Sequence, residues 1–126
     1  MLGISGKTSD NQELERLARS GDQRALLCEN MYCHQLAKHV GSYMVAMGGA
    51  DAIVFTGGIG ENNPQYRQAL GEKLAFLGVK IDDAKNHVRG EEIEISTPDS
   101  PIKVFVIPTN EELVIARDTL AIVNAL

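Results

Sequence analysis

The sequence predicts an α/β fold in which helices pack on a small sheet. Two short apolar runs, residues 52–56 and 102–107, are rich in β-branched residues, and each precedes a loop and a helical pattern. Strand–loop–helix units of this kind are typical of helices layered on a sheet. The chain has 126 residues, of which 44% are hydrophobic, so we expect one domain over residues 1–126 with a single aliphatic core.

The first part of the chain is expected to be helical. Residues 9–12, Ser-Asp-Asn-Gln, match a capping box and predict a short helix through Arg19. A long helix is predicted over residues 22–47, and Gly48-Gly49 ends it. Its apolar residues recur every three or four positions, which is the helical period. The stripe expected to face the core consists of Ala25, Cys28, Tyr32, Leu36, Val40, Tyr43 and Met47.

The middle of the chain carries the first strand–loop–helix unit. The run at 52–56 suits a strand covered on both faces, and the glycine-rich residues 57–60 predict a tight turn. Asn63 suits a helix N-cap and Pro64 the first helical position. The helix predicted over residues 64–77 is expected to bury Tyr66, Leu70, Leu74 and Leu77.

The last part of the chain repeats this order. Alternation predicts short edge strands at residues 79–81 and 93–95, and a second buried strand follows at 102–107. Thr109 and Glu112 match a capping box that opens the last helix. The residues expected to be buried in that helix are Leu113, Ala116, Leu120 and Val123.

Composition excludes several classes of partner. The net charge is −5 and the basic residues are scattered, which argues against a nucleic acid or an anionic membrane. No run of about 18 apolar residues and no signal-peptide pattern occurs. Cys28 and Cys33 are separated by about 500° of helical rotation, so no disulfide is expected between them, and two cysteines alone make no metal site. These features predict a reduced, cytoplasmic protein.

The glycine-rich turn at residues 56–62 is the first candidate site. Glycines after a strand let the backbone approach a ligand, and the following helix N-terminus attracts anions. The turn is no P-loop, because no Gly-Lys-Ser/Thr follows, and Asn63 stands where a dinucleotide fingerprint needs its third glycine. A tight turn that needs glycine for a positive φ explains the same residues. From the residues alone, both interpretations stay open.

Two polar segments give further candidates. Glu112 stands at the position that closes a capping box on Thr109. Glu111 has no such structural role, so its carboxylate is free to hold a divalent cation through water. The alternative is that the helix dipole simply stabilises the Glu111 carboxylate. In the first segment, Lys7 and Asp10 are able to contact ribose or phosphate, and the alternative is a helix cap beside a solvated lysine.

Together these segments resemble one known family. The residues that carry the resemblance are Leu-Gly-Ile-Ser-Gly at 2–6, Ser-Asp at 9–10, Phe-Thr-Gly-Gly-Ile-Gly-Glu-Asn at 55–62, Arg-Gly-Glu-Glu at 89–92, Pro-Thr-Asn-Glu-Glu-Leu at 108–113 and Ala-Arg-Asp at 116–118. Over essentially the whole chain they are similar to the end of the acetate kinase family, the acetate and propionate kinases. The resemblance implies part of an actin-like, ribonuclease-H-like ATPase domain. It also implies transfer of the terminal phosphoryl group of ATP to a short-chain carboxylate.

The resemblance also implies roles for particular residues. Glu111 matches the magnesium-associated glutamate of the family, and Mg²⁺ together with ATP or ADP is the expected ligand set. At the third position after Ser9 the family has Arg, but this chain has the uncharged Gln12, which predicts weaker nucleotide binding. The residues expected to bind the nucleotide are Asp10, Asn11, Gln12, Gly58, Ile59, Gly60, Glu61 and Asn62.

The length of the chain limits what is expected of it. A complete member of the resembled family is about three times longer, and its amino-terminal kinase domain carries the carboxylate pocket and the catalytic residues. No catalytic residue is therefore assigned, and the chain alone is expected to be inactive. The alternative is a non-catalytic dimerisation or nucleotide-binding module. The resemblance implies a homodimer, and the long helix supports one with additional apolar residues, namely Leu27, Met31, Met44 and Ala46.

Overall fold

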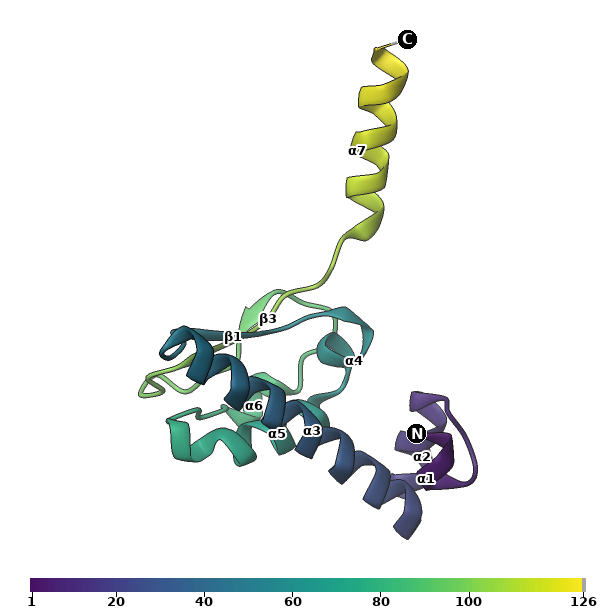
Figure 1. Cartoon of the computed structure of the whole chain (residues 1–126), viewed down its shortest axis with the longest axis vertical. Coiled ribbons are helices and arrows are strands. Elements are labelled where there is room, and N and C mark those ends of the chain that lie inside the picture. The colour runs from purple at the N-terminus through teal and green to yellow at the C-terminus, as the bar shows by residue number, and fades with distance from the viewer. Residues whose placement is uncertain (126) are drawn as a thin grey trace.

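The computed structural model describes residues 1–125 and has the predicted α/β architecture, with helices packed on a three-stranded sheet (Figure 1). Its elements in chain order are α1 Leu2–Ser5, α2 Asn11–Arg19, α3 Gln23–Met47, β1 Ala52–Phe55, α4 Gly57–Asn62, α5 Pro64–Leu74, the 3₁₀ helix η1 Ala75–Leu77, α6 Asp83–Asn86, β2 Ile93–Glu94, β3 Lys103–Val106 and α7 Glu111–Asn124. None of the helices in residues 1–125 is long and apolar enough to span a membrane.

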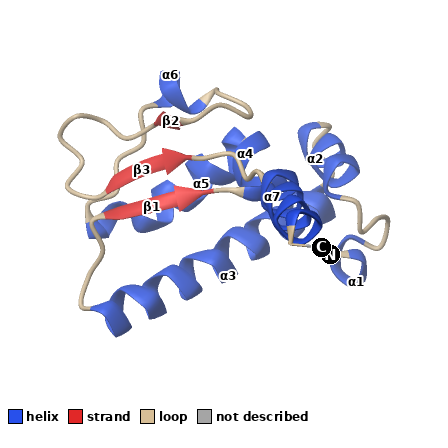
Figure 2. Ribbon diagram, turned by 90° about the horizontal axis from the view of Figure 1, so that it is seen from above, coloured by secondary structure: helices blue, strands red, loops and turns tan. Residues whose placement is uncertain are grey.

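The sheet has the order β1-β3-β2. Strands β1 and β3 are parallel, with Ala52 opposite Lys103, and β2 is antiparallel to β3 (Figure 2). The predicted edge strands are shorter than expected, since Val79 and Ile81 each form only an isolated bridge. Side chains two positions apart in a strand point to the same face, and Ile53 and Phe55 both pack against the core on the helix side of the sheet.

The other face of β1 is open. Ala52 is exposed and Val54 is 50% exposed, so the prediction of a strand covered on both faces is wrong. Within residues 1–125, the core lies on one side of the sheet, where α3 and α5 pack against β1 and β3. The buried residues of that core are Leu70, Leu74, Val79, Ile95, Ile102, Val104 and Val106.

The long helix forms where the sequence predicts it. The side chain of Asp22 accepts hydrogen bonds from the N–H groups of Arg24 and Ala25, and Gly48 ends the helix with a left-handed φ of 75°. The predicted stripe is wrong at its end, because Tyr43 and Met47 are 64% and 66% exposed. Met44 packs on the core instead. Leu36, Val40 and Met44 follow one another at intervals of four residues and so lie on the same side of the helix, which leaves Tyr43 pointing away from the core.

A second, smaller cluster holds the amino-terminal helices together. Leu14, Ala18, Ala25 and Cys28 pack between α2 and α3. The cap of α2 is Asp10, whose carboxylate accepts from the N–H of Glu13 at 2.8 Å, so the predicted Ser9–Gln12 capping box is wrong by one residue. Cys28 and Cys33 are free thiols, and both are buried, although burial was expected only of Cys28.

The glycine-rich segment folds as a short helix and not as a tight turn. Residues 57–62 form α4, and only Gly57 among its glycines has a positive φ, 70°. Gly60 packs closely, since a Cβ there would lie 3.3 Å from the carbonyl carbon of Phe55. Helix α5 then begins as predicted, with the Asn63 side chain accepting from the N–H of Tyr66 and Pro64 in the first turn.

The last helix, α7, projects away from the rest of the molecule (Figure 1). All its described residues are exposed, so the predicted burial of Leu113, Ala116, Leu120 and Val123 is wrong. The cap is also different from the prediction. Asn110, and not Thr109, accepts from the N–H of Leu113 at 3.1 Å. The apolar side chains of α7 have no partner among residues 1–125.

Candidate functional site

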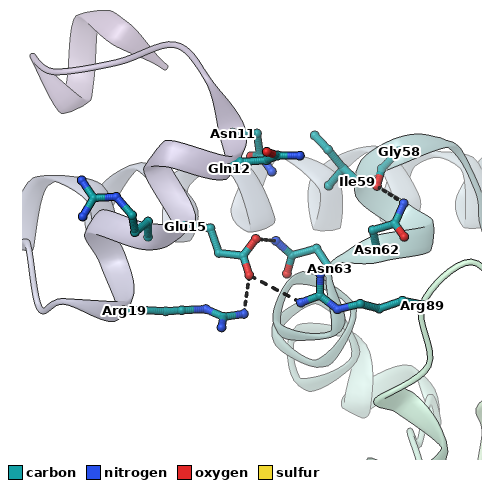
Figure 3. Close-up of a pocket in the computed structure, with 10 residues that line it drawn as sticks. Asn11, Gln12, Glu15, Arg19, Gly58, Ile59, Asn62, Asn63 and Arg89 are labelled. Carbon is teal, nitrogen blue, oxygen red and sulfur yellow. Dashed lines mark hydrogen bonds and ion pairs between the residues drawn. The ribbon is translucent and has the colours of Figure 1, made fainter.

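A cavity of about 880 Å³ opens between α2, α4, the start of α5 and the loop after α6 (Figure 3). Its walls therefore combine residues from two segments that the sequence analysis singled out separately, Asn11 and Gln12 from the first and Gly58, Ile59 and Asn62 from the second. The residues that line it are Asn11, Gln12, Glu15, Arg16, Arg19, Gly58, Ile59, Asn62, Asn63 and Arg89.

Helix α2 contributes one polar face to this cavity. Residues three and four positions apart lie on the same side of a helix, which brings Gln12, Glu15, Arg16 and Arg19 together. The opposite side of α2 carries the buried Leu14 and Ala18 and packs on α3. The amphipathic pattern of α2 thus fixes which side chains reach the cavity.

Glu15 joins three of the cavity walls. Its carboxylate accepts from Nδ2 of Asn63 at 3.2 Å and forms an ion pair with Arg19 on the next turn of α2. Nη2 of Arg89 lies 3.9 Å from Oε1 of Glu15 (Figure 3). The Glu15 side chain is only 17% exposed, whereas those of Arg19 and Arg89 are each 54% exposed, so solvent screens both ion pairs from the arginine side.

The wall of the cavity carries more positive than negative charge. Three arginines, Arg16, Arg19 and Arg89, line it against a single carboxylate, Glu15. Arg16 also donates to the exposed Glu13 at 2.6 and 2.8 Å, and these hydrogen bonds lower the pKa of the Glu13 carboxyl. A surplus of guanidinium groups around a cavity suits an anionic ligand such as a phosphate ester.

Glu61 ties the carboxyl ends of the two parallel strands together. Its Oε1 accepts from the N–H of Gly57 at 2.7 Å, from the N–H of Thr109 at 2.8 Å and from the hydroxyl of Thr109 at 2.9 Å. The two hydrogen bonds from Thr109, followed by that from Gly57, lower the pKa of the Glu61 carboxyl. Glu61 therefore holds the loop after β1 against the loop after β3.

The predicted nucleotide-binding residues fall into two groups. Five of them line the cavity, namely Asn11, Gln12, Gly58, Ile59 and Asn62. The other three are not among its lining residues. Asp10 caps α2, Gly60 packs against Phe55, and Glu61 bonds to Thr109.

Glu111, the predicted magnesium residue, is the first residue of α7 and is exposed. It directly follows the loop that Glu61 anchors at the carboxyl ends of β1 and β3. Residues 1–125 contain no group of three or more His, Cys, Asp or Glu side chains that could hold a metal ion. A single carboxylate is enough to bind Mg²⁺ when water and substrate phosphates supply the remaining ligands.

Sequence reasoning missed half of the lining residues. Arg16 and Arg19 could have been found, because they stand one and two helical turns after Gln12. Arg89 belongs to a segment that carries the family resemblance, but neither it nor Asn63 could be placed at the cavity from the sequence, since their position depends on how α5 and the loop after α6 pack against α2. The missed residues are Glu15, Arg16, Arg19, Asn63 and Arg89.

Comparison with known sequences points to one family. The acetate kinase of Phocaeicola vulgatus is 53% identical over 124 residues, which are 98% of this chain and 31% of that protein. The acetate kinase of Thermoanaerobacterium thermosaccharolyticum is 54% identical over 127 residues, or 100% of this chain and 32% of that protein. The chain thus spans about a third of the length of these relatives.

Comparison with solved structures agrees. The crystal structure of Porphyromonas gingivalis acetate kinase matches 97% of this chain and 31% of its own, with a TM-score of 0.87 and 44% identity. A propionate kinase from Francisella tularensis matches 91% of this chain and 29% of its own, with a TM-score of 0.81 and 45% identity. The fold is thus that of acetate kinases, a family of the actin-like ATPase fold. The model of the acetokinase family matches residues 1–117, and this chain belongs to that family.

Proposed function

We propose that this chain is the carboxy-terminal, nucleotide-binding part of an acetate kinase, which transfers the γ-phosphoryl group of ATP to acetate or another short-chain carboxylate. The observation that carries the proposal is the cavity, where residues 11–12 of α2 meet residues 58–62 of α4. Residues 58–62 carry the family resemblance, residues 11–12 directly follow Ser9-Asp10, which also carry it, and about 50 residues separate the two segments in the sequence.

The cavity offers the groups that an adenine nucleotide needs. A Cβ on Gly58 would meet nothing within 4 Å, so the glycine leaves open space beside the α4 backbone for a ring or a ribose. Asn11, Gln12 and Asn62 offer amide groups, which donate and accept hydrogen bonds. The arginine surplus favours the phosphates.

A bound Mg²⁺ supplies neutralisation of phosphate charge. Glu111 is the residue of this chain that would hold it, through water and together with the phosphates. Phosphoryl transfer depends mainly on positioning of the substrates and on charge neutralisation. A chain that holds the nucleotide therefore contributes to the reaction without a nucleophile or base of its own. We assign no catalytic residue to the chain.

Helix α7 supports the view that a larger protein completes this site. Leu113, Val114, Ile115, Leu120, Ile122 and Val123 are between 42% and 66% exposed. An apolar surface of this kind marks a contact with another polypeptide. We infer that the part of the enzyme absent from this chain, the expected amino-terminal kinase domain, packs against α7.

The second candidate function is a non-catalytic dimerisation module. Three apolar residues on α3 favour it, since Leu27, Met31 and Val45 are 51%, 41% and 84% exposed. One chain is able to carry both a nucleotide site and a dimer interface. The dimerisation module therefore replaces the nucleotide-binding function as the proposal only if the chain does not bind a nucleotide.

Titration of the ¹⁵N-labelled chain with ATP, with and without Mg²⁺, tests the nucleotide site. We expect amide shifts at residues 11–12 and 58–62, and tighter binding with Mg²⁺. Gly58→Val should weaken binding about tenfold or more, because a branched side chain fills the space left by the glycine. Gly3→Val is the matched control, a helical glycine with open space outside the cavity. Shifts that cluster elsewhere, or equal affinity in Gly58→Val, would contradict the proposal.

A further inference from the structure

Arg67 on α5 is the largest completely buried side chain of the described structure, with 0% exposure. It is not among the residues that line the nucleotide cavity. A charged side chain is rarely buried unless every polar atom has a partner, because desolvating a charge is costly. The partners of Arg67 therefore indicate what this residue holds in place.

All five N–H groups of the Arg67 guanidinium are used. Nε donates to Oδ1 of Asn86 at 2.8 Å, and Nη1 donates to the carbonyl oxygens of Gly60 at 2.7 Å and Glu61 at 2.9 Å. Nη2 donates to the carbonyl oxygens of Asn86 at 2.6 Å and Val88 at 2.7 Å. Every acceptor is a peptide or amide oxygen and none is a carboxylate, so these contacts do not form a salt bridge.

The peptide acceptors lie at the ends of two short helices. Gly60 and Glu61 belong to the last turn of α4, Asn86 is the last residue of α6, and Val88 follows it by two residues. Carbonyl groups at a helix C-terminus lack a partner within the helix and carry partial negative charge. Helices of six and four residues are too short to be stable alone. The Arg67 cation completes both ends at once.

Both helix ends continue into walls of the cavity. Helix α4 carries Gly58, Ile59 and Asn62, and Val88 directly precedes Arg89. The side chain of Asn86 is itself fixed, since its Nδ2 donates to the carbonyl oxygen of Pro64 at 2.9 Å. The guanidinium thus joins the backbone of α4 to the residue that precedes Arg89.

We propose that Arg67 is a positioning residue, which fixes α4 and Arg89 relative to each other and thereby sets the affinity of the cavity for an adenine nucleotide. This role rests on the proposed nucleotide-binding function. Lysine cannot replace arginine here, because its ammonium group has only three donors, whereas the planar guanidinium has five and reaches the ends of both helices.

The test is the Kd for Mg²⁺-ATP of the Arg67→Lys chain, measured together with its melting temperature. We expect a Kd at least about tenfold higher than that of the unsubstituted chain. Leu74→Ala is the matched control, a buried residue of the same helix that packs on the sheet core and lines no wall of the cavity. It should lower the melting temperature and leave the Kd within about twofold when both are measured well below melting.

Amide spectra give a signature that loss of stability alone does not produce. In Arg67→Lys the resonances of residues 58–62 and of Arg89 should move together, whereas in Leu74→Ala they should stay in place. Asn86→Ala serves as a second variant, because it removes one acceptor of Arg67, together with the Asn86–Pro64 hydrogen bond, and leaves the other four contacts of Arg67. It should raise the Kd about threefold or more, and it decides the question if Arg67→Lys fails to fold.

Each outcome has one meaning. Unchanged affinity in the folded variants, or an equal loss of affinity in Leu74→Ala, overturns the positioning role and leaves the proposed function intact. If the unsubstituted chain binds no ATP, the proposed function fails and the positioning role fails with it.

Discussion

Gln12 is the residue at which this chain departs from the arginine expected of its family. It lines the cavity one helical turn before Arg16. We expect Gln12→Arg to tighten ATP binding about fivefold, because a fourth guanidinium adds a charge-assisted contact at a partly exposed site. Calorimetric titration measures the change, and the neutral Gln12→Met is the control for side-chain length. No gain over Gln12→Met would mean that position 12 does not contact the nucleotide.

Glu61 gives a prediction for the dependence of stability on pH. Its hydrogen bonds to Thr109 and Gly57 lower the pKa of the carboxyl below its ordinary value of 4.5. The stability that the carboxylate contributes is therefore fully present above about pH 4.5 and is lost as the pH falls through the lower pKa of the folded state.

Glu61→Gln should therefore lower the melting temperature by a few degrees at neutral pH. An amide oxygen at the Oε1 position is uncharged, so the three hydrogen bonds that it accepts lose the strengthening that the carboxylate charge gives. The difference between the two proteins should shrink as the pH falls below that range. Thermal melts across a pH series measure it, and a difference that does not change with pH would contradict this role of Glu61.

Among the elements, α3 is the one expected to bring two copies of the chain together. Leu27, Met31 and Val45 lie on one face of the helix, since Met31 follows Leu27 by four residues, about one turn, and Val45 follows Leu27 by 18, about five turns. Met44 was expected on this face but packs on the core. Sedimentation at micromolar concentration should show a dimer that Val45→Asp dissociates.

Phe76→Asp is the control for this experiment, because Phe76 is 83% exposed and lies outside α3. It should leave the dimer unchanged. A monomeric unsubstituted chain, or equal dissociation by both variants, would contradict an interface on α3.

At the scale of the whole molecule, charge is distributed unevenly. The chain carries a net charge of −5, yet its cavity has three arginines against one glutamate. A negative surface disfavours nonspecific binding of polyanions, whereas the local surplus attracts an anion to one place. This distribution is consistent with a small phosphorylated ligand.

The chain alone should make no acetyl phosphate from acetate and ATP. It matches about 31% of the length of its relatives, and no residue of it is assigned to the carboxylate pocket or the transfer step. A hydroxamate assay for acyl phosphate should give the buffer background. Turnover that disappears in Glu111→Ala would contradict this expectation.

Much of the secondary structure was predictable because its signals are local. Asp22 and Gly48 bound α3, and Asn63 with Pro64 begins α5, through hydrogen bonds that span only a few residues. The α4 helix was not predictable in this way, because its end is completed by Arg67 from another helix.

The sequence by itself determined the order of the elements, the family resemblance, and the two segments that meet at the cavity. The tertiary structure decided which side chains line the cavity and which, like Arg67, bond to its walls without lining it. The contact between Glu15 and Asn63 joins residues 48 positions apart, and the open face of β1 and the exposed α7 depend on which elements are present to cover them. Local patterns specify helices and strands, whereas contacts between distant residues exist only once those elements have packed.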